Sequence, residues 1–140
     1  MADNTTDKRA RDFIEAMRKE RGYLPPSYPY VAEKDIEFLE AYDNLYKRSL
    51  SDGKALPAKI REFVAIGILA YRGNDPACYE HVKRALRLGA TKQEVLEAIE
   101  ATIVPGGTPT FGAGLRALMR VEEEEKKQEA EGHLGDVGTK

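Results

Sequence analysis

Two side chains near the middle of the chain, Glu62 and His81, are of types that could carry acid–base chemistry. Glu62 is the last charged residue before the uncharged run FVAIGILAY, and at helical spacing its neighbours are the apolar residues Ala58, Ile66 and Leu69. A carboxylate that is buried without a partner is strongly destabilising. We therefore expect Glu62 either to be neutral or to lie next to a hydrogen-bond donor.

His81 is the expected donor, because it shares the apolar face of the next predicted helix with Cys78 and Val82. The opposite face carries the charged residues Glu80, Lys83, Arg84 and Arg87. With a turn near Gly73, Glu62 lies eleven residues before the turn and His81 eight residues after it. At ~1.5 Å per residue the two positions are offset by about 4.5 Å along a helical hairpin, so their side chains can meet.

A glutamate bonded to a histidine can hold the imidazole tautomer and stabilise its charged form while the imidazole transfers a proton. The same two side chains could equally satisfy each other in a core and have no function. Two observations favour a function for Glu62 and His81. Apolar residues of equal volume would serve a core at least as well as a buried charged pair, and irregular segments, where pockets usually form, are predicted near the pair.

Further residues could line a substrate pocket at this pair. The candidates are Cys78, Tyr30, Tyr71, Arg72, Gly106 and Gly107. Cys78 lies three residues before His81 on the same helical face, although a lone cysteine on such a face is more often a small core residue. A substrate carboxylate would need a cation or amide donors, which Arg72, Arg84 or the backbone of Gly106 and Gly107 could supply.

The spacing of apolar residues predicts an all-α bundle of about six helices with a central buried helical hairpin. The helices are expected at about residues 8–21, 32–50, 57–72, 75–88, 91–104 and from about 115 into the acidic run EEEE. The proline-rich YLPPSYPYVAE is expected to be extended, and PGGTPTFGAG to be a loop. Because its second half is apolar on every face, the helix over 57–72 should be buried on all sides. We expect a single domain over 1–130 and a flexible tail over 131–140.

Composition excludes several classes of protein. No apolar run of the 140 residues approaches the ~20 that a membrane span needs, the start has no secretory pattern, and the cytoplasm is the expected location. The net charge of −2 and the scattered basic residues argue against a nucleic-acid partner. One cysteine and two histidines give neither a disulfide nor zinc-ligand spacing, so no metal and no cofactor are expected.

Three segments, LPAKIREFVAIGILAY, HVKRALRLGATKQEVLEAI and PGGTP, together resemble the carboxymuconolactone decarboxylase family. The resemblance covers about residues 56–118, and its most specific part is the H-x7-GAT-x2-E arrangement from His81 to Glu94. It implies an all-α fold like that of alkyl hydroperoxidase D, built on a helical hairpin. In the peroxidase branch of the family a glutamate, a C-x-x-C pair and a histidine form a proton relay, and Glu62 and His81 have the spacing of its glutamate and histidine.

The cysteine pair of the peroxidase branch is missing here. Its two positions fall on Asn74 and Ala77, while Cys78 stands one residue beyond the second. We therefore do not expect this chain to carry out a thiol–disulfide cycle. The resemblance is to the decarboxylase branch, which lacks cysteines and keeps the histidine matched by His81. That branch acts on a carboxylated lactone from aromatic-ring breakdown, and its members assemble as trimers or hexamers.

We accordingly expect a cofactor-independent lyase that uses His81 and Glu62 on a small carboxylated lactone or aromatic-derived acid. Two alternatives stay open. In the first, His81 activates Cys78 in a peroxide-reactive protein. In the second, the chain is a non-catalytic oligomer that binds a small carboxylate. A buried central helix in so short a chain also predicts a homo-oligomer, for which the resemblance implies a trimer or hexamer.

Overall fold

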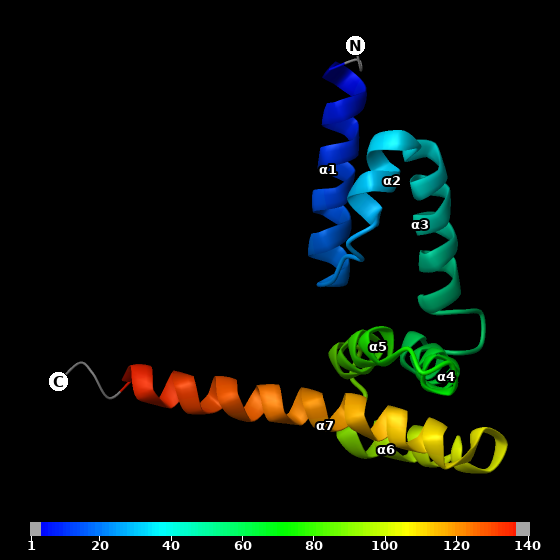
Figure 1. Cartoon of the computed structure of the whole chain (residues 1–140), viewed down its shortest axis with the longest axis vertical. Coiled ribbons are helices and arrows are strands. Elements are labelled where there is room, and N and C mark those ends of the chain that lie inside the picture. Colours follow the sequence, from blue (N-terminus) through cyan, green and yellow to red (C-terminus); the bar gives the residue numbers. More distant parts are fainter. Residues whose placement is uncertain (1–3, 137–140) are drawn as a thin grey trace. The chain divides into compact units, whose positions relative to one another are not determined.

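Helices make up nearly all of the described chain, which confirms the all-α prediction. The computed structural model describes the backbone of residues 4–136 and the side chains of residues 7–132. Within these residues there are seven α-helices and no strand. The chain divides into two compact units, Met1–Gly53 and Lys54–Lys140, which are described separately (Figure 1). That residues 1–130 form a single domain stays a prediction.

The first unit consists of α1 (Asn4–Arg21), α2 (Tyr28–Lys34) and α3 (Ile36–Leu50), with the short α2 between the two longer helices (Figure 1). Its core consists of Ala10, Ile14, Met17, Ala32, Ile36 and Leu39. The prediction that YLPPSYPYVAE is extended was wrong for residues 28–33, which belong to α2. Pro29 lies in the first turn of α2, where the missing N–H has no intrahelical partner to lose.

Ion pairs of the buried Asp43 carboxylate link α3 to α1. The Asp43 carboxylate accepts a hydrogen bond from Arg21, and it also lies 2.8 Å from Lys47 Nζ. Burial alone would raise the pKa of Asp43, but Lys47 and Arg21 overcome that effect and hold the pKa below its ordinary value. Asp43 is therefore ionised in the folded unit at neutral pH, and the pair contributes to stability.

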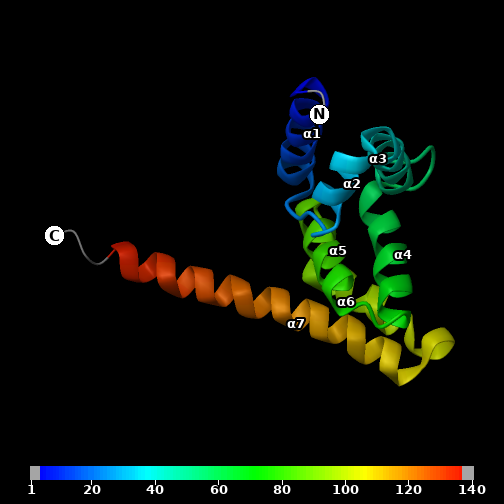
Figure 2. The ribbon, with the colours of Figure 1, turned by 45° about the horizontal axis from the view of Figure 1, so that its top comes forward.

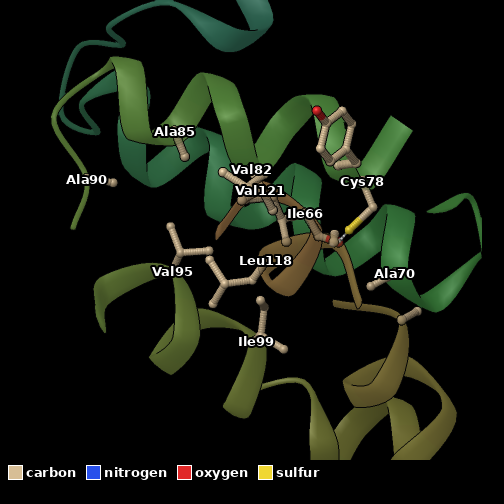
Figure 3. Close-up of a cluster of buried hydrophobic side chains, with 13 residues drawn as sticks. Ile66, Ala70, Cys78, Val82, Ala85, Ala90, Val95, Ile99, Leu118 and Val121 are labelled. Atoms are coloured by element: carbon tan, nitrogen blue, oxygen red, sulfur yellow. Dashed lines mark hydrogen bonds between the residues drawn. The ribbon is translucent and has the colours of Figure 1, made fainter. Parts of the chain in front are cut away.

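The second unit contains α4 (Ala58–Tyr71), α5 (Asp75–Arg87), α6 (Lys92–Glu100) and α7 (Ile103–Asp136). The first two form the predicted antiparallel hairpin, which lies across the long α7, while α6 runs along α7 (Figures 1 and 2). Gly73 adopts a left-handed φ of 65° in the hairpin turn, and the Asn74 side chain caps α5 by accepting from the N–H of Ala77 at 3.3 Å. Figure 3 shows the core between these helices, with Ile66, Val82 and Val121 among its members.

A capping box opens α6, at the residue where a helix was expected to begin. The Thr91 hydroxyl accepts from the N–H of Glu94 at 3.0 Å, and the Glu94 carboxylate accepts from the N–H of Thr91 at 2.8 Å. The expected end of this helix was wrong, because α6 stops at Glu100 and PGGTPTFGAG belongs to α7. The helix accommodates these residues through a kink at Gly107, which has a φ of 79°.

The long helix α7 continues to Asp136 and so includes residues 131–136 of the expected tail. Glu, Lys, Gln and Ala make up the preceding residues 122–131, and they are good helix formers even without burial. None of the helices in the described part of the chain has both the length and the apolarity that a membrane crossing requires.

The central helix α4 differs from expectation in its burial. Ile66 and Ala70 lie in the core, but Val64, Ile68 and Tyr71 are more than half exposed, so the helix is not buried on all sides. The reason is that α5, α6 and α7 cover only part of its circumference in a single copy of the chain.

Candidate functional site

The hairpin of α4 and α5 brings Glu62 and His81 together, as their spacing predicted. Glu62 is completely buried, and its Oε2 lies 2.6 Å from Nδ1 of His81. The His81 side chain keeps 17% of its surface exposed. The Glu62 carboxylate is thus inside the protein, while the His81 imidazole contacts both this carboxylate and the solvent.

Arg84 is a further member of this cluster. Its Nε lies 3.2 Å from Glu62 Oε1, at ion-pair distance but without the geometry of a hydrogen bond, and its side chain is 20% exposed. Arg84 was predicted to lie on the outward face of its helix, and this prediction was wrong. Three residues after His81, a side chain is rotated by only about 60° around the helix, and this spacing is the signal that could have identified it.

The arrangement determines how the imidazole can act. An ionised carboxylate only accepts hydrogen bonds, so Nδ1 of His81 is the donor when Glu62 is ionised. In the neutral ring, the lone pair is then on Nε2, which is the atom that can take up or deliver a proton. Arg84 places a positive charge beside the other carboxylate oxygen of Glu62. An imidazole held in this way is oriented to act as a general acid or base.

Cys78 belongs to the apolar core and not to this cluster. Its side chain is fully buried, and its thiol donates to the backbone carbonyl of Ile66 at 3.8 Å (Figure 3). Burial, together with the nearby Asp75 carboxylate, raises the pKa of the Cys78 thiol to about 11. A thiol of this kind is not a thiolate at neutral pH, and the structure gives no support to the peroxide-reactive alternative.

Two of the predicted pocket residues, Tyr71 and Gly106, line a different site. They lie in a groove of about 440 Å³ between α4 and the junction of α6 and α7. The groove is lined by Phe63, Val64, Gly67, Ile68, Tyr71, Ala101, Thr102, Pro105, Gly106 and Thr110. At ~100° per residue, Gly67, Ile68 and Tyr71 point away from the face of α4 that carries Glu62. Tyr71 and Gly106 therefore do not line a pocket at His81.

The remaining candidates in the second unit, Arg72 and Gly107, also lie apart from the cluster. Arg72 follows α4 as its C-cap, and Gly107 forms the kink of α7. The N–H of Gly106 already donates to the carbonyl of Thr102 at 2.8 Å, so it does not form the expected carboxylate-binding nest. Tyr30 belongs to the first unit, where its exposed ring lies 5.8 Å from Lys34 Nζ.

Among the described residues there is no group of three or more histidine, cysteine or carboxylate side chains that could hold a metal ion. The chemistry that the cluster itself offers is proton transfer by His81, with Glu62 and Arg84 as its support.

Comparison with known proteins identifies relatives of this chain. The model of the carboxymuconolactone decarboxylase family matches residues 37–119. An uncharacterized protein of Methanocaldococcus jannaschii is 29% identical over 100 residues, which make up 71% of this chain and 92% of the relative. An uncharacterized protein of Cupriavidus necator is 28% identical over 114 residues, or 81% of this chain and 92% of the relative.

A solved structure shares the fold. It is the crystal structure of a Burkholderia xenovorans LB400 protein that carries the provisional description carboxymuconolactone decarboxylase. It matches with a TM-score of 0.72 and 24% identity, over 90% of this chain and 98% of that one. This likeness concerns the fold alone.

Proposed function

Because the chain belongs to the carboxymuconolactone decarboxylase family, we propose that it is a cofactor-independent lyase in which His81 transfers the proton that accompanies loss of CO2. The observation that carries the proposal is the 2.6 Å contact between Nδ1 of His81 and the fully buried Glu62. A histidine oriented in this way has Nε2 as its reactive atom.

The substrate class is a small lactone or aromatic-derived acid whose carboxylate is attached next to a conjugated carbonyl group. The bond between the ring carbon and the carboxylate carbon breaks, CO2 leaves, and the electron pair moves into the carbonyl to form an enolate. The imidazolium of His81 then donates its Nε2 proton to that carbon, and the neutral ring regains a proton from water. The net change replaces one carboxylate by one hydrogen.

Glu62 and Arg84 are positioning residues in this scheme. Glu62 holds the ring orientation through Nδ1 and stabilises the charged imidazolium that the reaction needs. Arg84 lies on the other oxygen of the same carboxylate, so it compensates the buried charge when the ring is neutral. The cluster therefore carries a positive group beside the carboxylate in both protonation states of the ring.

The test is release of CO2 from a panel of carboxylated lactones and conjugated keto acids by the purified full chain, with the product made in D2O. We expect one solvent deuteron at the carbon that lost CO2, and a loss of about 10²–10⁴-fold in kcat/KM for His81→Ala. His133→Ala, which changes the other histidine of the chain, is the matched control and should retain full activity.

Two outcomes would reject the proposal. One is a His81→Ala variant that releases CO2 at the wild-type rate. The other is a chain that binds carboxylates of the panel, measured by calorimetry, without converting any of them. The second outcome would instead identify a carboxylate-binding module.

A further inference from the structure

Within the cluster of Glu62, His81 and Arg84, proton exchange with a bound molecule passes through a single atom. Nδ1 of His81 lies 2.6 Å from Glu62 Oε2, so Nε2 is the ring atom directed away from that carboxylate. Glu62 itself is completely buried. A guanidinium does not act as an acid or a base in proteins, so Arg84 contributes charge and no proton. The proton-transfer atom of the cluster is therefore Nε2 of His81.

Two other side chains of α5 that can carry a proton face different partners. The Cys78 thiol donates to the carbonyl of Ile66 at 3.8 Å, and burial raises its pKa to about 11. The Tyr79 hydroxyl donates to Glu124 of α7, and burial, with that carboxylate, raises its pKa to about 12. Neither group is a base at neutral pH, so neither serves as a second base beside His81.

The charges of the cluster balance without a substrate carboxylate. Arg84 Nε lies 3.2 Å from Glu62 Oε1. When Glu62 is ionised and the ring of His81 is neutral, the negative charge of the carboxylate is matched by the positive charge of the guanidinium. In this state the cluster has no excess charge that requires an anionic substrate, and its imidazole is in the form that accepts a proton.

The protonation step of the proposed lyase can also run in reverse. In the forward direction, the imidazolium gives a proton to the carbon of an enolate. By microscopic reversibility, the neutral imidazole removes a proton from that carbon when it bears a hydrogen in place of the carboxylate. The only other requirement is an adjacent carbonyl group that takes up the electron pair.

We propose that the chain has a second activity at this site, the isomerisation of unsaturated lactones that carry no carboxylate. Nε2 of His81 takes a proton from the α carbon of a β,γ-unsaturated lactone, and the electron pair of the broken C–H bond moves into the carbonyl to form a dienolate. The imidazolium then returns a proton to the γ carbon, and the double bond moves to the α,β position. Substrate and product have the same formula, so no co-reactant is consumed.

The inference rests on the proposed function in one respect, the role of His81 as the proton-transfer residue. It adds a stereochemical consequence. A protonated imidazole has two N–H groups, and the one at Nδ1 is donated to Glu62. One atom therefore both removes and returns the proton, so departure from the α carbon and arrival at the γ carbon take place on the same face of the lactone.

The first test uses α-angelica lactone, which has no carboxylate, and follows its conversion to the conjugated β-angelica lactone by proton NMR with the purified full chain. We expect conversion above the rate in buffer, and a loss of about 10²-fold or more in kcat/KM for His81→Ala and for His81→Gln. Cys78→Ala is the matched control on the same helix and should keep the activity, because the thiol belongs to the core. Circular dichroism checks that all variants are folded.

The second test identifies the faces of the lactone. The substrate carries deuterium on one chosen face of the α carbon, and its loss or retention shows from which face the proton is removed. The configuration of the γ carbon in the product, measured by chiral chromatography, shows the face of delivery. This measurement does not depend on how much of the label exchanges with water at the ring of His81, which is 17% exposed.

Isomerisation that depends on His81, persists in Cys78→Ala and uses a single face supports the proposal. Three results would overturn it: a chain that releases CO2 from carboxylated lactones but leaves α-angelica lactone unchanged, wild-type isomerisation by His81→Ala, or delivery on the opposite face. Isomerisation without release of CO2 from any carboxylated substrate would reject the lyase and support this activity. The two proposals therefore fail separately.

Discussion

Replacing Glu62 by glutamine is the most informative single change, because it keeps the shape of the side chain and removes its charge. The variant loses the ion pair with Arg84 at 3.2 Å and turns the charge-assisted bond to His81 into a neutral one. A hydrogen bond to a charged group contributes about 1.5–3 kcal/mol and a neutral one about 0.5–1.5 kcal/mol. Since His81 and Arg84 are partly exposed, we expect a net loss of roughly 2 kcal/mol in the free energy of unfolding.

For a chain of this length, that loss corresponds to a fall of about 5–8 °C in Tm, which differential scanning calorimetry resolves. Activity should fall further, by about 10²-fold or more in kcat, because the imidazolium loses its counter-charge. Glu100→Gln, at an exposed position of α6, is the control and should change neither quantity. A Glu62→Gln variant with wild-type Tm and wild-type turnover would refute the role assigned to the carboxylate.

Three further predictions concern other residues of the chain. Gly114→Ala should lower the free energy of unfolding by about 1–3 kcal/mol, because the added Cβ would lie 2.7 Å from Cγ2 of Ile99. Cys78 should react with iodoacetamide at pH 7 at least about a hundredfold more slowly in the folded chain than in guanidinium, since burial raises its pKa to about 11 and removes it from solvent. Asp43→Asn should lower Tm at pH 7, and its difference from the wild type should shrink as the pH falls below about 4, because a lowered carboxylate pKa stabilises the fold only while the group is ionised.

Gly114→Ala has a control variant, and the other two predictions each have an outcome that would contradict them. Gly112→Ala, whose added Cβ would have only an ordinary contact of 3.6 Å with Arg116, should be neutral or stabilising by denaturant titration. Rapid labelling of folded Cys78 would show that the thiol is accessible after all. A Tm difference for Asp43→Asn that stays constant from pH 7 to pH 2 would show that the ionised carboxylate contributes nothing to stability.

Local spacing was enough to predict the contact between Glu62 and His81. A hairpin of two helices has a fixed rise per residue, so counting residues from the turn at Gly73 places the two positions within about 4.5 Å of each other along the hairpin. The capping box of Thr91 and Glu94 was predictable for the same reason, because it involves residues within one turn. The family relationship, first indicated by the segments around His81, was confirmed over residues 37–119.

Other features depended on which helices pack together, and the sequence did not contain that information in local form. The proline-rich segments entered helices because Pro29 lies in a first turn and the left-handed Gly107 absorbs a kink. Arg84 turned toward Glu62 because a buried carboxylate attracts any cation within reach, whatever face the periodicity assigns to it.

The apolar run of α4 shows most clearly what the sequence and the tertiary structure each determined. Its composition established that every face of the helix prefers burial, and this follows from the sequence alone. Only the tertiary structure decided which face α5, α6 and α7 cover, and that Val64, Ile68 and Tyr71 stay outside. The physical reason is that hydrophobic residues favour burial without specifying a partner, so the neighbouring helices determine which of them are buried.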